Sequence, residues 1–518
     1  MSAIWTGVSG LSSYSSAIAN TSNNLANTGT VGFKSSRILF ADLLSTTAGG
    51  TSDGSQIGCG SQVSTVSLST SWGGTQEASN STDMAITGDD GYFLVKKPDT
   101  DDVYYTRAGN FNRNKNGYLT SANGYNVQGW AVDQDAIDKT EASGTVLTDV
   151  PTTGTVTDIL ISSDAMSAKA TSSVSVITNL DSQTTVGTKD ATDPYFTMFK
   201  SYDAESDPPV SDSDYSTSVN VYDSEGNSHT LTTYYSKVST EGGKEYWEYT
   251  VAMDPDEDGN SATSGTTKAG VLMIGTMTYS ASGELENETA YTLSGSDPTS
   301  LSSWTQASLS SSGTPQFSAT FLSSTSGSAL AAQTVTYANG LSTTSGSWSA
   351  TAATSAAGIG AAAANTAGFD LSTAKNAATS STNYATSSST TNKSQDGYAS
   401  GSLLSTEVDE DGVLYGNYSN GQTKALFVLA LADFINPTDL ENAGNNMYKA
   451  NDLTGEAKVG RANSGTIDGV AGYRLEASNV DMAKEMVNLI TFQRAFQSNS
   501  KVVTTADAMM EKALEIKK

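Results

Sequence analysis

Apolar residues recur at seven-residue intervals near both ends of the chain. The N-terminal series is Ile4, Leu11, Ile18 and Leu25, and the C-terminal series is Met482, Leu489, Phe496, Val503 and Met510. This spacing puts the side chains on one narrow stripe of an α-helix. We therefore expect two end helices that pair as a coiled coil and leave apolar surface for neighbouring copies to cover.

The pattern also predicts where the C-terminal helix begins and how long it is. A helix over residues 480–516 would be about 55 Å long, at a rise of about 1.5 Å per residue. Ser478 followed by Asp481 resembles a capping box that would start it. The simpler alternative is two ordinary amphipathic helices packed on a globular core. The narrow stripes and the absence of charge from residues 1–33 argue against that alternative.

Between the ends the pattern changes to short strands separated by turn residues. Met84–Ile86 and Tyr92–Val95 flank the turn sequence at 88–91 and predict a hairpin. Residues 213–253 alternate apolar and polar side chains, which is typical of a half-buried sheet. Other predicted strands are Tyr104–Thr106, Tyr118–Thr120, Val413–Tyr415, Tyr473–Leu475 and the continuous apolar run Ala425–Ala432.

These patterns predict a mainly β, multi-domain chain with α-helical coiled-coil termini, in which the two end helices pair and the β domains are nested between them. The predicted domains are a helical domain from 1–32 and 476–518, a connector with extended segments at 33–83, a β domain from 84–145 and 399–475, and outer β domains within 146–398. Within the outer region, residues 321–395 are rich in Ser, Thr and Ala. They form either a separate small subdomain or a partly mobile segment.

Charge narrows the range of partners. The 518-residue chain carries a formal net charge of −28, although only 16% of its residues are charged. Such a field repels phosphate backbones and anionic membrane surfaces, so we expect no nucleic-acid partner. Residues 1–33 have neither the cationic start of a secretory signal peptide nor an apolar run long enough to span a membrane. We therefore expect no membrane insertion.

The sequence has very few thiol or imidazole side chains that could serve in catalysis or metal binding. Cys59 and His229 are the only cysteine and histidine, so neither an intrachain disulfide nor a Cys/His metal cluster is available. The serine-nucleophile pattern at 50–54 lies in a Gly/Ser-rich connector, and a catalytic serine would need a histidine beside it. We expect His229 to be an exposed turn residue and Cys59 to be a small packing residue.

An acidic loop is the remaining candidate for ion binding. Asp254, Asp256 and Asp258 are spaced like the start of a calcium loop, but Gly265 occupies the position that needs a bidentate glutamate. A solvated turn is therefore the favoured interpretation. Taken with the previous candidates, the sequence predicts no catalytic residue, no metal site and no cofactor.

Several separate motifs carry a family resemblance. The motif residues are Asn24, Asn27, Gly32, Phe33, Lys34, Arg107, Gly109, Phe111, Ser478, Asn479, Val480, Asp481, Gln493 and Arg494. Together these stretches resemble the axial protein family of the bacterial flagellum, which includes rod, hook and hook-associated proteins. Within that family, Val221–His229 and Tyr418–Gln422 resemble hook subunits.

The resemblance implies a structural role. A protein of this family leaves the cell through the flagellar type III export apparatus without a cleavable signal peptide, and it polymerises with its own copies outside the cell. Its terminal helices form an inner tube and its β domains form outer layers. A hook subunit would also meet the rod protein, the hook cap and the hook–filament junction proteins, and the tube would bend while it transmits torque.

Two other functions compete with this interpretation. A distal rod or other axial protein would share the terminal motifs, but the large middle section argues against it. A secreted calcium-binding adhesin is favoured only by the acidic, β-rich middle. For a hook subunit, we expect the Gly/Ser-rich connector around 46–62 to serve as a hinge between inner and outer layers.

Overall fold

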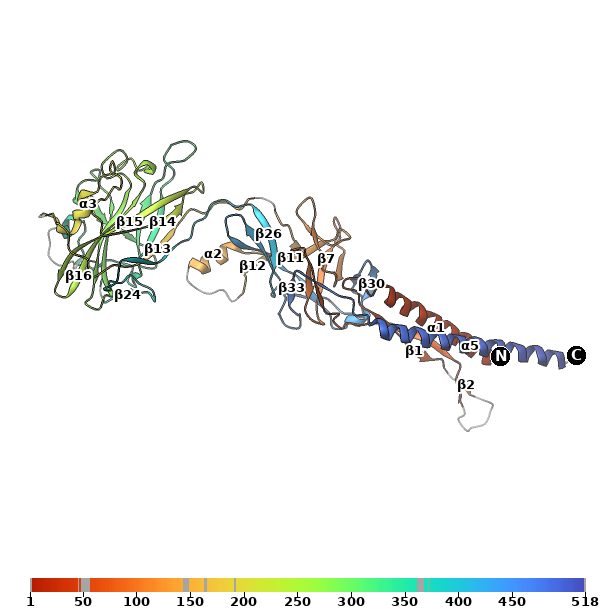
Figure 1. The fold of residues 1–518 in the computed structure, drawn as a ribbon. Coiled ribbons are helices and arrows are strands. Elements are labelled where there is room, and N and C mark those ends of the chain that lie inside the picture. The colour runs from red at the N-terminus through yellow and green to blue at the C-terminus, as the bar shows by residue number, and fades with distance from the viewer. Residues whose placement is uncertain are drawn as a thin grey trace. The chain divides into compact units, whose positions relative to one another are not determined.

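The computed structural model describes residues 2–516, except 45, 48–55, 143–148, 163–164, 191, 361–367 and 371. Its contacts divide the chain into two compact units (Figure 1). The first unit contains residues 1–164 and 402–518, and the second contains residues 165–401. None of the described helices is long and apolar enough to cross a membrane.

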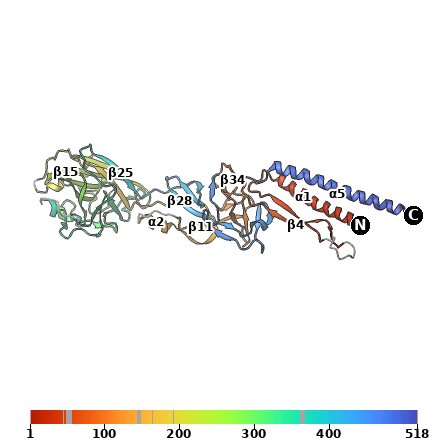
Figure 2. The same cartoon turned by 90° about the horizontal axis from the view of Figure 1, so that it is seen from below.

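The two ends of the chain form a helix pair in the first unit. Helix α1 (Ser2–Ala26) lies beside α5 (Met482–Ile516), and α5 continues past the start of α1 in both views (Figures 1 and 2). The prediction of paired terminal helices is therefore confirmed. The predicted capping box is wrong, because the Lys484 backbone N–H donates to Asp481 Oδ1 at 3.1 Å. Asp481, and not Ser478, caps α5.

A long hairpin follows α1. Strands β1 (Ser36–Asp42) and β4 (Ser61–Leu68) are antiparallel, and β2 (Thr46–Thr47) pairs with β3 (Gln56–Ile57) farther along the same hairpin. The hydroxyl of Ser13 in α1 donates to the Ser61 carbonyl at 3.1 Å, which ties the hairpin to the helix. The predicted hinge falls on this hairpin, and its residues 48–55 lie outside the described residues.

A thirteen-stranded sheet forms the β domain of the first unit, and strands from both halves of the chain share it. Its N-terminal strands are β7 (Tyr92–Lys96), β8 (Val103–Thr106), β9 (Asn112–Arg113), β10 (Leu119–Thr120), β11 (Asn126–Val132) and β12 (Thr152–Asp158). Its C-terminal strands are β26 (Leu403–Val408), β27 (Val413–Tyr418), β28 (Thr423–Leu429), β29 (Leu431–Asp433), β30 (Glu441–Gly444), β31 (Met447–Lys449) and β32 (Lys458–Gly460). Strand β11 pairs with β28, and β7 pairs with β29, so neither half completes the sheet alone.

Two predictions about these strands need correction. Met84–Ile86 is strand β6, but its partner is β33 (Val470–Gly472) and not the strand that follows the turn, so no hairpin forms there. The apolar run Ala425–Ala432 is not one strand, because the pairing is interrupted at Ala430 between β28 and β29.

The remaining short elements border this sheet. Strand β5 (Thr75–Glu77) pairs with β34 (Arg474–Glu476) immediately before α5. Helix α2 (Gln134–Ala142) follows β11, and the 3-10 helix η4 (Pro437–Asp439) follows β29. Strand β12 pairs with β11, so residues 152–158, which we had grouped with the outer region, lie in the first unit.

The second unit contains two larger sheets with a common core. One sheet has the order β14 (Tyr215–Tyr222), β15 (Ser228–Glu241), β16 (Lys244–Met253), β17 (Val271–Tyr279), β18 (Leu285–Leu293) and β19 (Trp304–Gln306). The other has the order β20 (Ser308–Leu309), β21 (Pro315–Ala319), β22 (Gln333–Ala338), β13 (Ser173–Asn179) and β25 (Ser389–Gln395). Side chains from both sheets, including Trp247 and Tyr337, belong to one buried cluster.

Short helices and one small ribbon complete the second unit. They are η1 (Pro194–Phe196), α3 (Thr197–Ser201), η2 (Pro255–Glu257), η3 (Leu301–Ser303), α4 (Ala357–Gly360) and the pair β23 (Leu341–Thr343) with β24 (Ala374–Asn376). Strands β22 and β25 lie within the predicted segment 321–395, and both belong to the five-stranded sheet. The described part of that segment is therefore built into the second unit.

Candidate functional site: the end-helix pair and its junction with the β domain

Small residues form the contact between α1 and α5, which together we call the end-helix pair. The helices are antiparallel, because Gly7 meets Val503 and Gly10 meets Asn499. A Cβ atom on Gly7 would lie 2.7 Å from Val503 Cγ2, and one on Gly10 would lie 2.8 Å from Asn499 Oδ1. The buried residues of α1 are Gly7, Gly10, Ser13, Ala17, Thr21 and Asn24. Small side chains on this face allow the two helices to approach closely.

Helix α5 is exposed over most of its surface. Ala506 is its only buried residue, and every residue from 507 to 516 is exposed. The exposed large apolar residues of α5 are Met482, Met486, Val487, Ile490, Phe496, Val502, Met509, Met510, Leu514 and Ile516. On α1, Trp5 and Val8 are exposed as well. A helix pair with this much apolar surface in water is incomplete without a partner.

The predicted seven-residue stripes lie partly in the pair and partly in solvent. Ile4, Leu11, Ile18, Leu25, Leu489 and Val503 are half-buried, whereas Met482, Phe496 and Met510 are exposed. Val503 contacts the Gly7 position directly. The stripes therefore contribute only in part to the contact within one subunit, and their role as a polymer seam stays a prediction. The small-residue face of α1 was not predicted, although Gly7, Gly10, Ser13 and Ala17 recur every three or four residues.

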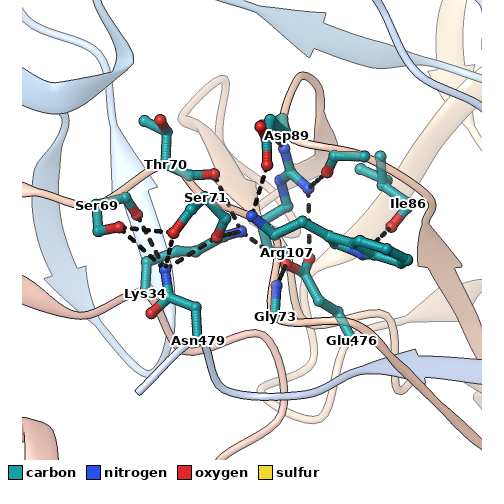
Figure 3. A network of polar contacts seen from close by, with 12 residues as sticks. Lys34, Ser69, Thr70, Ser71, Gly73, Ile86, Asp89, Arg107, Glu476 and Asn479 are labelled. Atoms are coloured by element: carbon teal, nitrogen blue, oxygen red, sulfur yellow. Dashed lines mark hydrogen bonds and ion pairs between the residues drawn. The ribbon is translucent and has the colours of Figure 1, made fainter. Parts of the chain in front are cut away.

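A buried ion cluster joins the end-helix pair to the β domain (Figure 3). We call Lys34, Arg107 and Glu476 the junction cluster. Lys34 Nζ lies 2.6 Å from Glu476 Oε1, Arg107 Nη1 lies 3.4 Å from Glu476 Oε2, and all three side chains are fully buried. Lys34 and Glu476 are 442 positions apart in the sequence, so the cluster connects the two ends of the chain.

Backbone groups complete the coordination of the junction cluster. Lys34 also donates to the carbonyls of Thr70 and Ser71, and Arg107 donates to those of Gly88 and Asp89. The guanidinium carbon of Arg107 lies 5.0 Å from the Tyr92 ring centroid, within the range of a cation–π contact. Burial and the nearby Arg107 charge lower the pKa of Lys34, while Glu476 acts in the opposite direction. Glu476 is therefore the counter-charge that keeps two buried cations stable.

Two asparagine side chains fix the backbone around the junction cluster. Asn479 Oδ1 accepts from the Ser35 N–H at 2.7 Å. Asn479 Nδ2 donates to the Ser71 carbonyl at 2.9 Å (Figure 3). The Asn24 side chain accepts from the Ser36 N–H and donates to the Ser36 carbonyl. Each asparagine oxygen thus supplies the acceptor for a backbone N–H, which a side chain without an acceptor in that place would leave unsatisfied.

Two glycines and a phenylalanine of the motifs have steric roles in the same region. Gly32 has φ +67°, and a Cβ atom there would lie 2.5 Å from the backbone nitrogen of Ala108. A Cβ on Gly109 would collide with the Met84 carbonyl oxygen. Phe111 is fully buried and packs edge-on against Phe93, with ring centroids 5.2 Å apart. The two glycine positions require glycine, because backbone atoms leave no room there for a Cβ atom.

The other motif residues divide between the junction and the surface. Phe33 is buried beside Lys34, and its carbonyl accepts from the Asn479 N–H. Asn27, Ser478 and Val480 are half-buried around it. Gln493 and Arg494 are exposed on α5, far along the helix from the junction. Sequence reasoning did not name Glu476 among the candidate residues, although Lys34 and Arg107 lie in otherwise uncharged motifs and would need a counter-charge when buried.

In the second unit, the prediction for His229 is wrong. His229 is not an exposed turn residue: it is 5% exposed on β15, stacks on Phe321 with ring centroids 4.0 Å apart, and its two ring nitrogens lie 2.8 Å from Glu257 and 3.1 Å from Asp223. Asp258 is also buried, and it accepts from the Thr263 hydroxyl and the Gly270 N–H. These side chains connect loops of the second unit.

The described residues contain no cluster of three or more His, Cys, Asp or Glu side chains that could hold a metal ion. The serine pattern at 50–54 lies outside the described residues. Cys59 is half-buried.

Comparison with known protein families defines the class to which this architecture belongs. Three family models match: "Flagellar hook protein FlgE/F/G D1 domain" over residues 85–172, "Flagellar basal body protein FlaE D2 domain" over residues 179–398, and "Flagellar basal body rod FlgEFG protein C-terminal" over residues 471–516. The last of these models spans the whole of α5 together with Glu476. The class is that of the axial proteins of the bacterial flagellum.

Full-length relatives identify the branch of this class. The flagellar hook protein FlgE of Escherichia coli K12 is 28% identical over 98% of both chains, and that of Treponema pallidum is 28% identical over the whole of both chains. A crystal structure of Helicobacter pylori flagellar hook protein FlgE2 is 14% identical over 78% of this chain, with a TM-score of 0.45. The chain belongs to the flagellar hook protein family.

Proposed function

We propose that this hook subunit polymerises through its end-helix pair into a curved, flexible tube that transmits torque from rod to filament. The observation that carries the proposal is the exposed apolar surface of α5, which buries only Ala506 within the subunit. Neighbouring copies would cover this surface and pack the predicted stripes of both helices. The end-helix pair then forms the innermost layer of the tube.

The β domains form the outer layers in this proposal. A bent tube that rotates must lengthen and shorten each row of subunits once per turn. Polar contacts that include water accommodate such sliding better than a dry apolar interface does. Residues 298–369 of the second unit contain no charged residue, which reduces repulsion between copies of an acidic chain.

The partners follow from the same role. The tube would contact the rod protein at one end and the hook–filament junction proteins at the other. The hook cap would assist growth, and the type III export apparatus would deliver the chain outside the cell. The protein would act as a structural element and not as an enzyme. No observation in the described residues favours the rod or the calcium-binding adhesin over the hook.

Electron microscopy of salted-out protein tests the proposal with one truncation. Removing residues 507–518 deletes four exposed large apolar residues of α5 and no described buried one. We expect curved hollow tubes from the full chain, and monomers with an unchanged melting temperature from the truncated chain. Equally long tubes from the truncated chain would contradict the proposed role of α5, and straight tubes from the full chain would favour a rod.

A further inference from the structure

The charged residues of the end-helix pair are segregated along α5. Helix α1 has none, whereas α5 carries Lys484 and Glu485 in its first turn, Arg494 and Lys501 in its middle, and Asp507, Glu511, Lys512 and Glu515 in its last third. The side chains of Arg494, Lys501, Asp507 and Glu511 are exposed, and none of these four forms an ion pair or side-chain hydrogen bond with another described residue. Four exposed charges without a partner in the middle and last third of α5 require an explanation beyond the single subunit.

Helical geometry separates the two kinds of charge. Arg494 and Lys501 are seven residues apart and share one face, and Asp507 and Glu511 are four apart and share another. At about 3.6 residues per turn the two faces are roughly 110° apart, and at about 1.5 Å per residue their midpoints are roughly 17 Å apart along the axis. The cationic face therefore cannot reach the acidic face of its own helix.

The net charge of the chain shows why this arrangement matters. Copies that each carry −28 repel one another, so assembly requires local contacts that bring unlike charges together. A contact between two different faces of identical subunits is heterologous, and such contacts build open helical polymers. A second copy displaced along the axis by about 17 Å would place its acidic face beside the cationic face of the first.

We propose that Arg494 and Lys501 of one copy bind Asp507 and Glu511 of a neighbouring copy, and that this contact sets the stagger between adjacent α5 helices. The inference rests on the proposed polymerisation through the end-helix pair and adds its electrostatic register. It also gives the motif residue Arg494 a role that the single subunit does not provide.

The chain contains a matched control for this contact. Lys512 and Glu515 lie on the same part of α5, but they pair with each other at 2.7 Å within one helix. Their charges are therefore already compensated. Reversing this pair should leave assembly unchanged, although it alters charge within the same turns as the acidic face.

Charge reversal tests the inference in seeded assembly at an ionic strength of about 0.1 M, where surface charges still interact. The cationic-face variant carries Arg494→Glu and Lys501→Glu, and the acidic-face variant carries Asp507→Lys and Glu511→Lys. We expect each variant alone to raise the critical concentration at least about tenfold. The fourfold variant, with both faces reversed, should assemble nearly as well as the unaltered chain.

Mixing the two variants excludes misfolding as the cause. An equimolar mixture restores unlike charges at every contact, so we expect it to copolymerise where neither variant does so alone. Assembly of each variant at the unaltered critical concentration would overturn the inference, as would failure of both the mixture and the fourfold variant. If the proposed function were wrong, the unaltered chain itself would form no polymer. That outcome differs from a loss of assembly in the charge-reversed variants alone.

Discussion

Glu476 is the residue on which the two ends of the first unit converge. It is the only described carboxylate within ion-pair distance of Lys34 or Arg107, and both cations are fully buried. Its removal would leave two like charges close together in a low-dielectric site.

We therefore expect Glu476→Gln to lower the free energy of unfolding of the first unit by about 3–5 kcal/mol, the usual cost of breaking a buried ion pair on one side. Hydrogen exchange would measure this loss of stability, with the amides of the second unit as an internal reference. The control is Asp101→Asn, which removes the exposed pair with Lys96 and should change nothing measurable. Unchanged protection of residues 33–110 in Glu476→Gln would contradict the assigned role of the junction cluster.

Two buried glutamates give the second unit a dependence on pH. Burial raises the pKa of Glu248 and that of Glu288 to about 8, although each accepts hydrogen bonds. Glu248 accepts from the N–H groups of Met198 and Phe199, and Glu288 accepts from the Tyr249 hydroxyl. The ordinary pKa of a glutamate is 4.5. Between pH 4.5 and about pH 8, the two glutamates are therefore protonated in the folded unit and ionised in the unfolded chain.

It follows that the free energy of unfolding of the second unit falls as pH rises from about 4.5 through about 8. We expect calorimetry to show its melting temperature decreasing over this range. Glu288→Gln keeps the acceptor for Tyr249 and should remove about half of the dependence, since two groups share it. Glu248→Gln should also destabilise the unit at every pH, because an amide can accept only one of the two N–H bonds through oxygen. A pH-independent melting temperature would refute the assignment.

At the residue scale, the sequence predicted positions better than it predicted partners. Lys34, Arg107 and Asn479 were singled out as motif residues, and the structure brings all three to one junction. Glu476 was missed because no local pattern shows which cation a distant carboxylate will meet. His229 was assigned to an exposed turn because its covering groups, Glu257 and Phe321, come from loops 28 and 92 positions later.

At the scale of elements, the end-helix pair depends on the absence of side chains. Gly7 and Gly10 let Val503 and Asn499 approach α1, so larger residues there must move α5 away. We expect Gly10→Leu to lower the free energy of unfolding by about 1–3 kcal/mol through overpacking, despite the better helix propensity of leucine.

Faster hydrogen exchange of residues 495–506 would report the opening of the pair. The matched control is Ser12→Leu, which adds the same side chain at an exposed position of α1. If Gly10→Leu and Ser12→Leu left equal protection of α5, the close-contact account would be wrong.

Periodicity predicted the existence of elements more reliably than their pairing. The end helices and the strands of residues 213–253 were recognised because their apolar residues repeat with the period of a helix or of a strand. The hairpin at 84–95 was wrong because β6 pairs with β33, whose sequence lies at 470–472. A turn sequence shows that the chain reverses, but it does not show that the flanking strands prefer each other to distant partners.

At the scale of the whole molecule, each subunit has features that only neighbours can satisfy. The exposed apolar residues of α5 need cover, and its segregated charges need counter-charges from another copy. The β sheets, in contrast, bury their own cores within each unit. We therefore expect the two parts of the subunit to have different roles in the polymer. The end-helix pair holds the polymer together, and the β domains form layers with weaker contacts around it.

The most direct test of this account is a cryo-electron microscopy reconstruction of tubes assembled from the full chain. We predict that α1 and α5 form the innermost layer and that neighbouring copies cover Met509, Leu514 and Ile516. A reconstruction in which the β domains make the continuous contacts, while α5 stays exposed or unordered, would contradict the account.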